Sequence, residues 1–419
     1  MTDLLDPEFI NLSTPIPKRS SALILWQQIR LSLLKIVGVL YPKRTTSLRQ
    51  MKILLIRPDH LGDLLFLTPA LRYLRSLLPA AEIYLMVGPW GEDVYRHNPH
   101  INQLIVCDFP GFTRRPKPSP WQPYQVLFQQ ARQLKQHQFD MAIVLRFDHW
   151  WGAWLTAAAG IPHRYGYNMP EVAPFLTNAL PYNPARHEVE QNWRLIHYAW
   201  SRGSLSIVDS WSDAESMGSL EFFTNEADRA WVDQWLQDNQ IVEERPLVVI
   251  HPGTGAAVKH WRVRAWATLA QRLIDDYDCQ IVFSGSEDEK QLCQNIIAKM
   301  TSTPFSVAGQ TNLAKLAALM GNATLAIGPD TGPLKLAAAV GTPTVELYGP
   351  VDVEKFGPWY DRSRQRVVHS ALSCIACNQL DYSTAQVENH FCVRGLSVDW
   401  VLHEVVDLLQ QVLSDESAS

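Results

Sequence analysis

The sequence predicts an α/β protein made of two doubly wound domains. Short apolar runs of strand length alternate with stretches whose apolar residues recur at helical spacing, which is typical of parallel βαβ units. This alternation occurs twice, once after Met51 and again after Pro246. The 419 residues, 47% of them apolar, are also more than one ordinary core requires. Ligands are expected at the carboxyl ends of the strands, in a cleft between the two domains.

The first fifty residues are expected to form a basic arm. Residues 9–50 contain seven Lys and Arg and no Asp or Glu, although the whole chain has a net charge of −5, which argues against nucleic acid as its partner. A helix is predicted over Leu23–Leu40, but Arg30 and Lys35 make a membrane-spanning position costly. Two alternatives are open: residues 20–44 lie on a membrane surface, or the helix packs on the protein itself.

Regular elements are expected in each half. The first series has strands over 52–58, 82–88, 103–109 and 141–147, with helical patterns over 61–79, 124–136 and 150–160. Five prolines predict a loop over 109–124. The second series has strands over 246–253, 279–286, 325–330 and 344–350, with helices over 263–277, 289–300, 312–323 and, at the end of the chain, 398–413.

The predicted domain organisation follows from these series. An amphipathic arm over 1–50 precedes an N-terminal domain over 51–202. A polar linker over 203–223 leads to a C-terminal domain over 224–396, and a terminal helix and tail occupy 397–419.

The six cysteines do not suggest a disulfide scaffold, and no signal peptide is visible, so a cytoplasmic location is expected. Cys374 and Cys377 have a CxxC spacing, with Cys392 beyond them. A zinc site would need a fourth ligand from His369, His390 or His403. A structural loop lined by thiols is favoured over a metal site.

Polar residues that follow the first strand form one candidate site. Arg57 ends this strand, Gly62 permits a tight turn, and Asp63 stands at the start of the next helix. Two interpretations of Asp63 are open, a reactive carboxylate and a helix N-cap, and local sequence favours the cap. Arg57 could equally form a simple ion pair with a neighbouring carboxylate.

Two further candidate stretches lie in the second series. In HPGTG, residues 251–255, small residues including Thr254 let backbone amides approach an anion, and Lys259 adds a positive charge. The spacing is not that of a P-loop. For HPGTG the alternative is a solvent-facing turn with a surface lysine. After the strand over 325–330, Asp330, Thr331, Gly332 and Pro333 lead into a short helix whose N-terminus would bind a diphosphate, with a strand-turn-helix that binds no ligand as the alternative.

Three of these stretches together resemble a known family. IRPDHLGDLLFLTPALRYLR, VVIHPGTGAAVKHW and GPDTGPLKLAAAVGTPTVELYGP are similar, in this order, to the signature regions of the heptosyltransferase-like glycosyltransferases of family 9. The resemblance extends from about Met51 to Val412. It implies the glycosyltransferase B fold with two Rossmann-like domains, an inverting reaction, and no metal or other cofactor.

The resemblance also assigns roles to individual residues. Asp63 matches the general base, which overrides the N-cap interpretation, with Arg57 and Gly62 on the acceptor side. Residues at or near the donor positions are Thr254, Lys259, Glu287 (with Asp288 or Glu289 as alternatives), Asp330, Thr331, Gly332, Pro333 and Lys335. Where this chain has Lys335, the family usually has His.

The implied reaction moves a sugar, heptose or similar, from a nucleotide diphosphate donor, for instance an ADP-linked one, to a glycan or lipopolysaccharide-type acceptor. The enzyme would work in the cytoplasm, at the inner face of the cytoplasmic membrane. Two alternatives are a homologue that binds nucleotide sugars without turnover and a sugar-nucleotide epimerase.

Overall fold

The expected strands form two six-stranded sheets in a computed structural model of the chain, which describes residues 21–41, 51–113, 119–204 and 217–418. The chain divides into two compact units between Gly218 and Ser219. This point falls inside the linker predicted over 203–223, of which residues 205–216 lie outside the described residues. Of the predicted arm, residues 21–41 are described.

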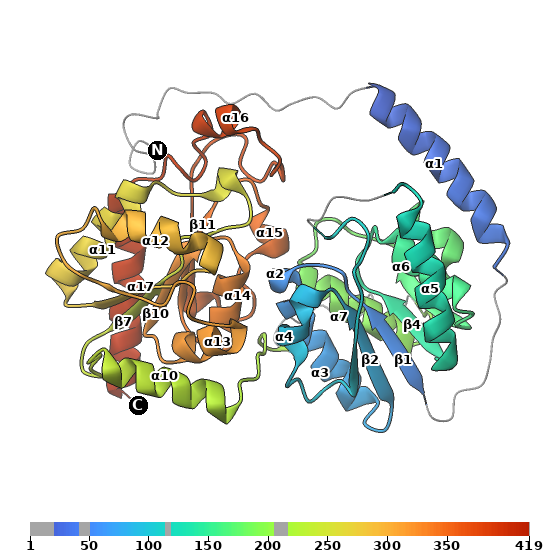
Figure 1. The fold of residues 1–419 in the computed structure, drawn as a ribbon, viewed down its shortest axis with the longest axis horizontal. Helices are drawn as coiled ribbons and strands as arrows, with labels where there is room; N and C mark the ends of the chain where they lie inside the picture. The colour runs from blue at the N-terminus through green and yellow to red at the C-terminus, as the bar shows by residue number, and fades with distance from the viewer. Residues whose placement is uncertain (1–20, 42–50, 114–118, 205–216, 419) are drawn as a thin grey trace. The chain divides into compact units, whose positions relative to one another are not determined.

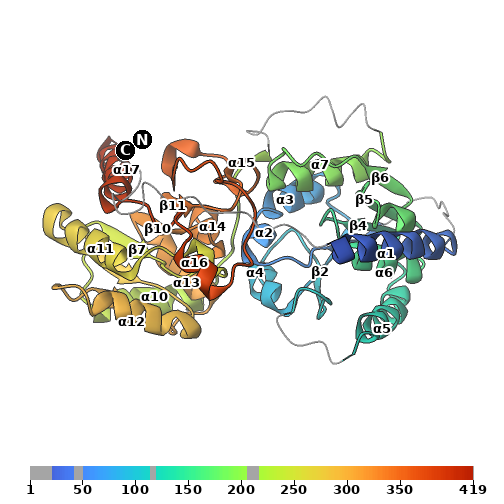
Figure 2. The same ribbon diagram turned by 90° about the horizontal axis from the view of Figure 1, so that it is seen from above.

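The first sheet has the strand order β3-β2-β1-β4-β5-β6, and every pair is parallel. Figure 2 shows α3 and α7 on one side of this sheet and α5 and α6 on the other. Its strands are β1 (Lys52–Ile56), β2 (Glu82–Val87), β3 (Gln103–Val106), β4 (Met141–Val144), β5 (His163–Tyr167) and β6 (Asn178–Leu180). Its helices are α1 (Ser21–Val39), α2 (Leu61–Leu65), α3 (Thr68–Leu77), α4 (Glu92–Tyr95), α5 (Gln122–Gln136), α6 (Trp150–Ala158) and α7 (Glu188–Trp200), with short 3-10 turns η3 (Pro89–Gly91) and η4 (Ala173–Phe175).

The second sheet repeats this topology in the order β12-β11-β10-β7-β8-β9, again all parallel. Figure 1 labels its strands β7, β10 and β11. Its strands are β7 (Leu247–Ile250), β8 (Gln280–Phe283), β9 (Phe305–Ser306), β10 (Leu325–Pro329), β11 (Thr344–Tyr348) and β12 (Gln365–His369). Its helices are α10 (Glu226–Asp238), α11 (Val263–Tyr277), α12 (Lys290–Ile297), α13 (Leu313–Gly321), α14 (Gly332–Ala339), α15 (Val353–Phe356), α16 (Thr384–Glu388) and α17 (Val398–Ala418), with 3-10 turns η5 (Ala257–Lys259), η6 (Glu287–Glu289) and η7 (Arg362–Arg364).

The structure differs from the expected elements in a few places. The helical pattern over 61–79 forms two helices, because Pro69 starts a new helix at α3 instead of continuing α2. The strands expected over 103–109 and 141–147 end at Val106 and Val144. The terminal helix is part of the second core, since its apolar face is buried with α11 and the sheet; these residues are Val401, Leu402, Val405, Leu408, Leu409 and Val412.

The N-terminal helix α1 packs on the first unit. Leu34 is buried in that unit's core. The hydroxyl of Tyr41, two residues after the helix, accepts a hydrogen bond from the indole N–H of Trp154. Gly38 lies so close to Pro174 that a Cβ at this position would stand 2.5 Å from the proline Cβ. The alternative of a helix packed on the protein's own surface is therefore confirmed for this face of α1.

Candidate active site

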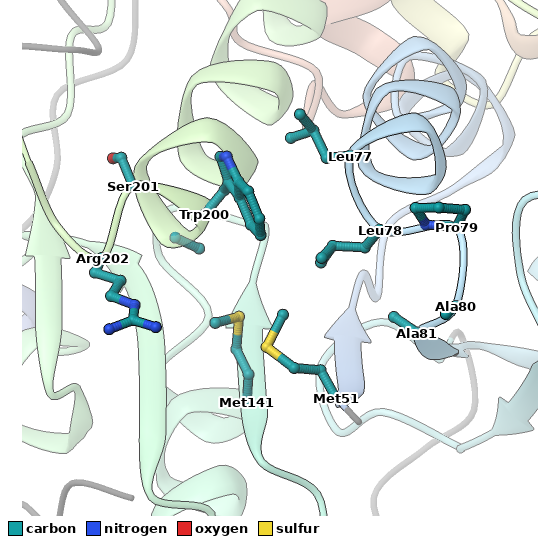
Figure 3. Close-up of a pocket in the computed structure, with 11 residues that line it drawn as sticks. Met51, Leu77, Leu78, Pro79, Ala80, Ala81, Met141, Trp200, Ser201 and Arg202 are labelled. Carbon is teal, nitrogen blue, oxygen red and sulfur yellow. The ribbon is translucent and has the colours of Figure 1, made fainter. Parts of the chain in front are cut away.

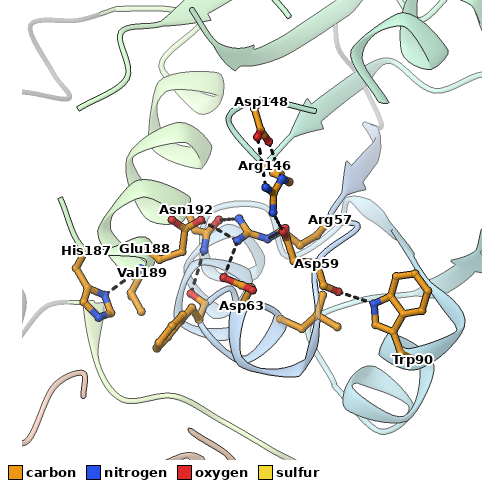
Figure 4. A network of polar contacts seen from close by, with 12 residues as sticks. Arg57, Asp59, Asp63, Trp90, Arg146, Asp148, His187, Glu188, Val189 and Asn192 are labelled. Atoms are coloured by element: carbon orange, nitrogen blue, oxygen red, sulfur yellow. Dashed lines mark hydrogen bonds and ion pairs between the residues drawn. The ribbon is translucent and has the colours of Figure 1, made fainter. Parts of the chain in front are cut away.

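Charged residues gather at the carboxyl ends of β1 and β4, the two neighbouring strands where the chain order of the first sheet reverses. Arg57 follows β1 directly, and Asp63 lies in α2, the helix that comes next. Arg146 follows β4 after one residue. Figure 4 shows these side chains pointing toward one another. Such a reversal point is where open α/β sheets usually bind ligands.

Arg57 is the centre of this network, and its side chain is almost completely buried. Its guanidinium donates to the carboxylate of Glu188 at 2.7 Å and to the side-chain oxygen of Asn192 at 2.8 Å, both on α7. Its Nε lies 2.6 Å from the Asp59 carboxylate, and Asp63 lies at 3.7 Å. An ion pair with a neighbouring carboxylate was one of the two interpretations of Arg57, and the structure gives it three carboxylate neighbours.

Asp59 is shared between two arginines. Its carboxylate is buried and is paired with Arg57 and, by a short hydrogen bond, with Arg146. Arg146 also donates to Asp148 at 2.6 Å. Burial lowers the pKa of the neighbouring His149 to about 3, so that ring is neutral at physiological pH.

Asp63 differs from its neighbours because its side chain is 31% exposed. The N-cap of α2 is His60 and Asp63 is the third residue of the helix, so the N-cap interpretation of Asp63 is wrong. Removal from water, followed by the negative charge of Asp59, raises the pKa of Asp63 to about 7, although Arg57 opposes this shift. Asp63 is thus a carboxylate that water can reach and that can take up a proton near neutral pH.

The network holds more negative than positive charge. Arg57 and Arg146 face the four carboxylates of Asp59, Asp63, Asp148 and Glu188. Three of these make close ion pairs with an arginine, whereas Asp63 has only the 3.7 Å contact. The excess negative charge of the network therefore favours protonation of Asp63 more than that of the other three carboxylates.

In the second unit, Lys259 and Asp330 meet at the carboxyl ends of β7 and β10. The Lys259 ammonium donates to the backbone oxygen of Asp330 at 2.6 Å and to its carboxylate at 3.1 Å. β7 and β10 are neighbours at the point where this sheet's chain order reverses, as β1 and β4 are in the first. The structure therefore brings together two residues that the sequence places 71 positions apart.

The turn before α14 has the features of an anion site. Thr331 is the N-cap with an extended backbone, its side chain makes no capping hydrogen bond, and the helix begins at Gly332 with Pro333 in its first turn. The hydroxyl of Thr254, on the loop after β7, is buried and has no hydrogen-bond partner among the described residues. Free donors at a helix N-terminus suit a phosphate.

Lys335, the residue that replaces the usual His of the family, makes its contacts inside the domain. Its ammonium is 3% exposed and donates to the Glu346 carboxylate at 2.6 Å and to the Tyr348 hydroxyl at 2.5 Å, both on β11. Burial raises the pKa of Glu346, and the ammonium of Lys335 opposes that shift. The expected positive charge is present, and it forms a buried ion pair with Glu346.

The acidic residues Glu287 and Glu289 of η6 differ in their exposure and in their contacts. Glu287 is 72% exposed and pairs with Lys290 at 3.5 Å. Glu289, one of its alternatives, accepts hydrogen bonds from Ser286 and lies against Gly253. Glu289 is thus the acid that contacts the loop after β7.

A family model described as glycosyltransferase family 9 (heptosyltransferase) matches residues 127–386, which is more than half of the chain. The chain belongs to glycosyltransferase family 9. Its general nature as a glycosyltransferase, expected from the three motifs, is confirmed.

Relatives agree with this assignment. Lipopolysaccharide heptosyltransferase 2 of Escherichia coli is 25% identical over 328 residues, which cover 75% of this chain and 87% of that protein. A solved glycosyl transferase family 9 structure from Veillonella parvula superposes with a TM-score of 0.71 at 21% identity, covering 88% of this chain and 100% of the other. The E. coli ADP-heptose lipopolysaccharide heptosyltransferase II gives 0.68 at 22% identity, covering 86% and 99%. The predicted glycosyltransferase B fold is confirmed.

Several residues of the two charged clusters were absent from the sequence interpretation: Asp59, Arg146, Glu188 and Asn192 in the first unit and Glu346 in the second. One signal could have revealed Glu346. A single carboxylate within an otherwise apolar strand needs a buried partner, and TVELY contains one.

A cavity of about 620 Å³ in the first unit is remote from these residues. It lies at the amino ends of β1 and β4, where Met51 and Met141 face each other below Trp200 (Figure 3). Its lining is mainly apolar and belongs to the opposite edge of the sheet, so it has no part in the site.

Within the described part of the chain, no group of three or more His, Cys, Asp or Glu residues is arranged to hold a metal ion. This includes Cys374, Cys377 and Cys392, of which Cys392 is buried. No helix in the same ranges is long and apolar enough to cross a membrane.

Proposed function

We propose that this family 9 enzyme transfers a sugar, heptose or similar, from a nucleotide diphosphate donor to a hydroxyl group of a glycan or lipopolysaccharide-type acceptor. The transfer inverts the anomeric centre and uses no metal. The observation that carries this proposal is Asp63, a solvent-accessible carboxylate with a pKa of about 7 at the carboxyl edge of the first sheet. The names of the relatives, which are heptosyltransferases, support the choice of sugar.

The first part of the mechanism is proton removal. Asp63, ionised, accepts the proton of the acceptor hydroxyl while the oxygen forms a bond to the anomeric carbon of the donor sugar. Arg57 holds Asp63 in place at 3.7 Å without neutralising it through a close ion pair. General-base catalysis of this kind commonly contributes about 10²–10⁴-fold.

The second part is departure of the nucleoside diphosphate. The bond between the anomeric carbon and the diphosphate oxygen breaks, and the oxygen keeps the electron pair. Lys259 and the amide groups at Thr331 and Gly332 stabilise the charge that develops on it. Thr254 adds a hydroxyl donor that is already removed from water.

A donor screen tests the proposal. Thermal shifts with ADP-, GDP-, UDP- and dTDP-sugars should show one preferred nucleotide sugar, because a ligand at 100 times its Kd stabilises the fold by about 2.7 kcal/mol. Product formation with that donor and a lipopolysaccharide-type acceptor then confirms transfer. Binding without product for every acceptor tried would identify a non-catalytic homologue.

The pH dependence of the rate follows from the pKa of Asp63. The base must be ionised, so kcat/KM should rise about tenfold per pH unit at low pH and level off above about pH 7. Initial rates between pH 5 and 9 measure this limb. A limb near pH 4, the ordinary range of a carboxyl group, would contradict the assignment.

We further propose that α1 holds the enzyme at a membrane surface, the inner face of the cytoplasmic membrane. One face of α1 packs on the first unit, and the other exposes apolar side chains at alternating spacings of three and four residues. These are Trp26, Ile29, Leu33, Ile36 and Leu40, each more than half exposed. Trp121 (71% exposed), just before α5, and Phe128 (44%), on α5, add to the exposed aromatic surface of the same unit. Exposed tryptophan next to a basic, acid-free segment suits anionic lipid.

Two substitutions on this face separate lipid binding from packing. Trp26→Glu with Ile36→Glu should reduce co-sedimentation with phosphatidylglycerol vesicles at least about fivefold, since both side chains are exposed and neither supports the fold. Deleting the whole arm is less informative, because α1 also covers Trp150 and Phe175.

Val242→Glu, an exposed apolar position in the second unit, is the matched control and should bind vesicles normally. If the double variant kept its vesicle binding but changed from dimer to monomer in solution, this face of α1 would be an interface between two copies instead.

A further inference from the structure

Four alternating charges lie in a row at the carboxyl edge of the second sheet. Lys259 pairs with Asp330 at 3.1 Å, Asp330 lies 3.9 Å from Lys335, and Lys335 pairs with Glu346 at 2.6 Å. The row crosses three neighbouring strands, because Lys259 follows β7, Asp330 follows β10, and Glu346 is on β11. The Asp330 carboxylate lies next to both ammonium groups, and the Glu346 carboxylate lies next to that of Lys335.

The fixed end of the row is the pair of Lys335 and Glu346. Both side chains are buried, with 3% and 0% exposure. The Tyr348 hydroxyl accepts from Lys335 and donates to the backbone oxygen of Phe356, which ties the pair to the end of α15. A buried ion pair of this kind keeps its geometry, because separating the charges in a dry environment is costly.

The other end of the row is Lys259. Its side chain is 13% exposed and it comes from a short 3-10 turn, not from a long helix. In the proposed function this ammonium binds the donor diphosphate. Two phosphate charges compete with the single carboxylate of Asp330 for it, so donor binding draws Lys259 away from Asp330.

Asp330 then needs another partner. Its Oδ2 faces Lys259 and its Oδ1 faces Lys335, so each oxygen already lies near one of the two ammonium groups. The contact with Lys335, at 3.9 Å, is longer than a hydrogen bond in this structure. A small rotation of the carboxylate would shorten it.

We propose that the Asp330 carboxylate exchanges its ion-pair partner when the donor binds, leaving Lys259 and pairing with Lys335. Lys335 is then a positioning residue: it is held by Glu346, and it orients Asp330 toward the donor sugar. This inference rests on the proposed function. The released oxygen of Asp330 accepts hydrogen bonds from sugar hydroxyl groups.

The test compares the affinity for a nucleotide sugar, ADP-heptose, with the affinity for the same nucleoside diphosphate without the sugar, ADP. In the double variant Lys335→Met/Glu346→Met both buried charges are removed, so no unpaired charge is left in the core. Isothermal titration with ADP and with ADP-heptose is performed on this variant and on the wild type. The expected result is an unchanged Kd for ADP, within about twofold, and a Kd for ADP-heptose that is at least about tenfold weaker.

Three further variants complete the experiment. Lys335→Arg retains the charge and should recover part of the preference for ADP-heptose over ADP. Lys259→Met should weaken ADP and ADP-heptose alike, since both carry the diphosphate. Lys299→Met, at an exposed lysine of the same domain, should change neither.

Other outcomes overturn the inference. Equal weakening of ADP and ADP-heptose in the double variant, or a lower melting temperature with an unchanged preference for the sugar, would show that Lys335 only stabilises the fold. Failure of the wild type to bind any nucleotide sugar would instead overturn the proposed function, and this inference with it.

Discussion

Replacing Asp63 by Asn should reduce kcat by about 10²–10⁴-fold while the Kd of the donor stays within about twofold. Asn has the same shape as Asp but cannot accept the acceptor's proton. The candidate donor residues belong to the other unit of the chain, so donor binding should be spared. Single-turnover rates and donor titrations, performed on both proteins at pH 8, measure the two effects.

Asp63→Asn should also change the pH dependence of the melting temperature. The pKa of Asp63 is raised in the folded protein, so the folded state binds the proton more tightly than the unfolded state does. The stability due to this group is fully present below about pH 4 and is lost as the pH rises through about 7. Asp63→Asn should therefore melt at a higher temperature than the wild type at pH 8, and at nearly the same temperature at pH 4. Retained turnover, or a lower melting temperature at pH 8, would contradict the assignment of Asp63 as the base.

Replacing Arg57 by Met should destabilise the first unit by about 3–5 kcal/mol, because it leaves the buried carboxylates of Asp59 and Glu188 without their shared partner. For a unit of this size that corresponds to a fall in Tm of roughly 6–20 °C. Calorimetry measures it. The remaining negative charges also favour protonation of Asp63, so the acid limb of the rate should move above pH 7.

Two controls make this prediction specific. Arg57→Lys keeps the charge but loses the fork that contacts several partners at once, so an intermediate loss of stability is expected. Arg132→Met, at an exposed position of α5 in the same unit, should leave the Tm almost unchanged. Equal effects of Arg57→Met and Arg132→Met would show that the network contributes nothing to stability.

The sheets could be predicted in part because their central strands are buried on both faces and appear as continuous apolar runs. β1, β2, β7, β8, β10 and β11 were all expected near their observed positions. Four strands were missed, β5, β6, β9 and β12, since β5 is HRYGY, β6 and β9 have three and two residues, and β12 is QRVVH with only two apolar residues. Such segments become strands only because a neighbouring strand offers them hydrogen bonds.

The candidate site residues were predictable where they follow a predicted strand closely. Arg57, Asp63, Lys259 and Asp330 are of this kind, and their position at a sheet edge follows from the parallel topology. Glu188 and Asn192 could not be found in this way, because they lie more than 130 residues from Arg57 in the chain and on the helix α7, which was not predicted. Their contact with Arg57 depends on how α7 crosses the sheet.

The buried pair of Lys335 and Glu346 has a consequence for the evolution of the family. A lysine at position 335 with an apolar residue at 346 would leave an uncompensated ammonium in a dry core, and a glutamate at 346 without a cation would leave a bare carboxylate. The two positions, eleven residues apart, must therefore change together. Members with lysine at the first should carry an acid at the second, and this covariation would mark a lineage within family 9 from sequence alone.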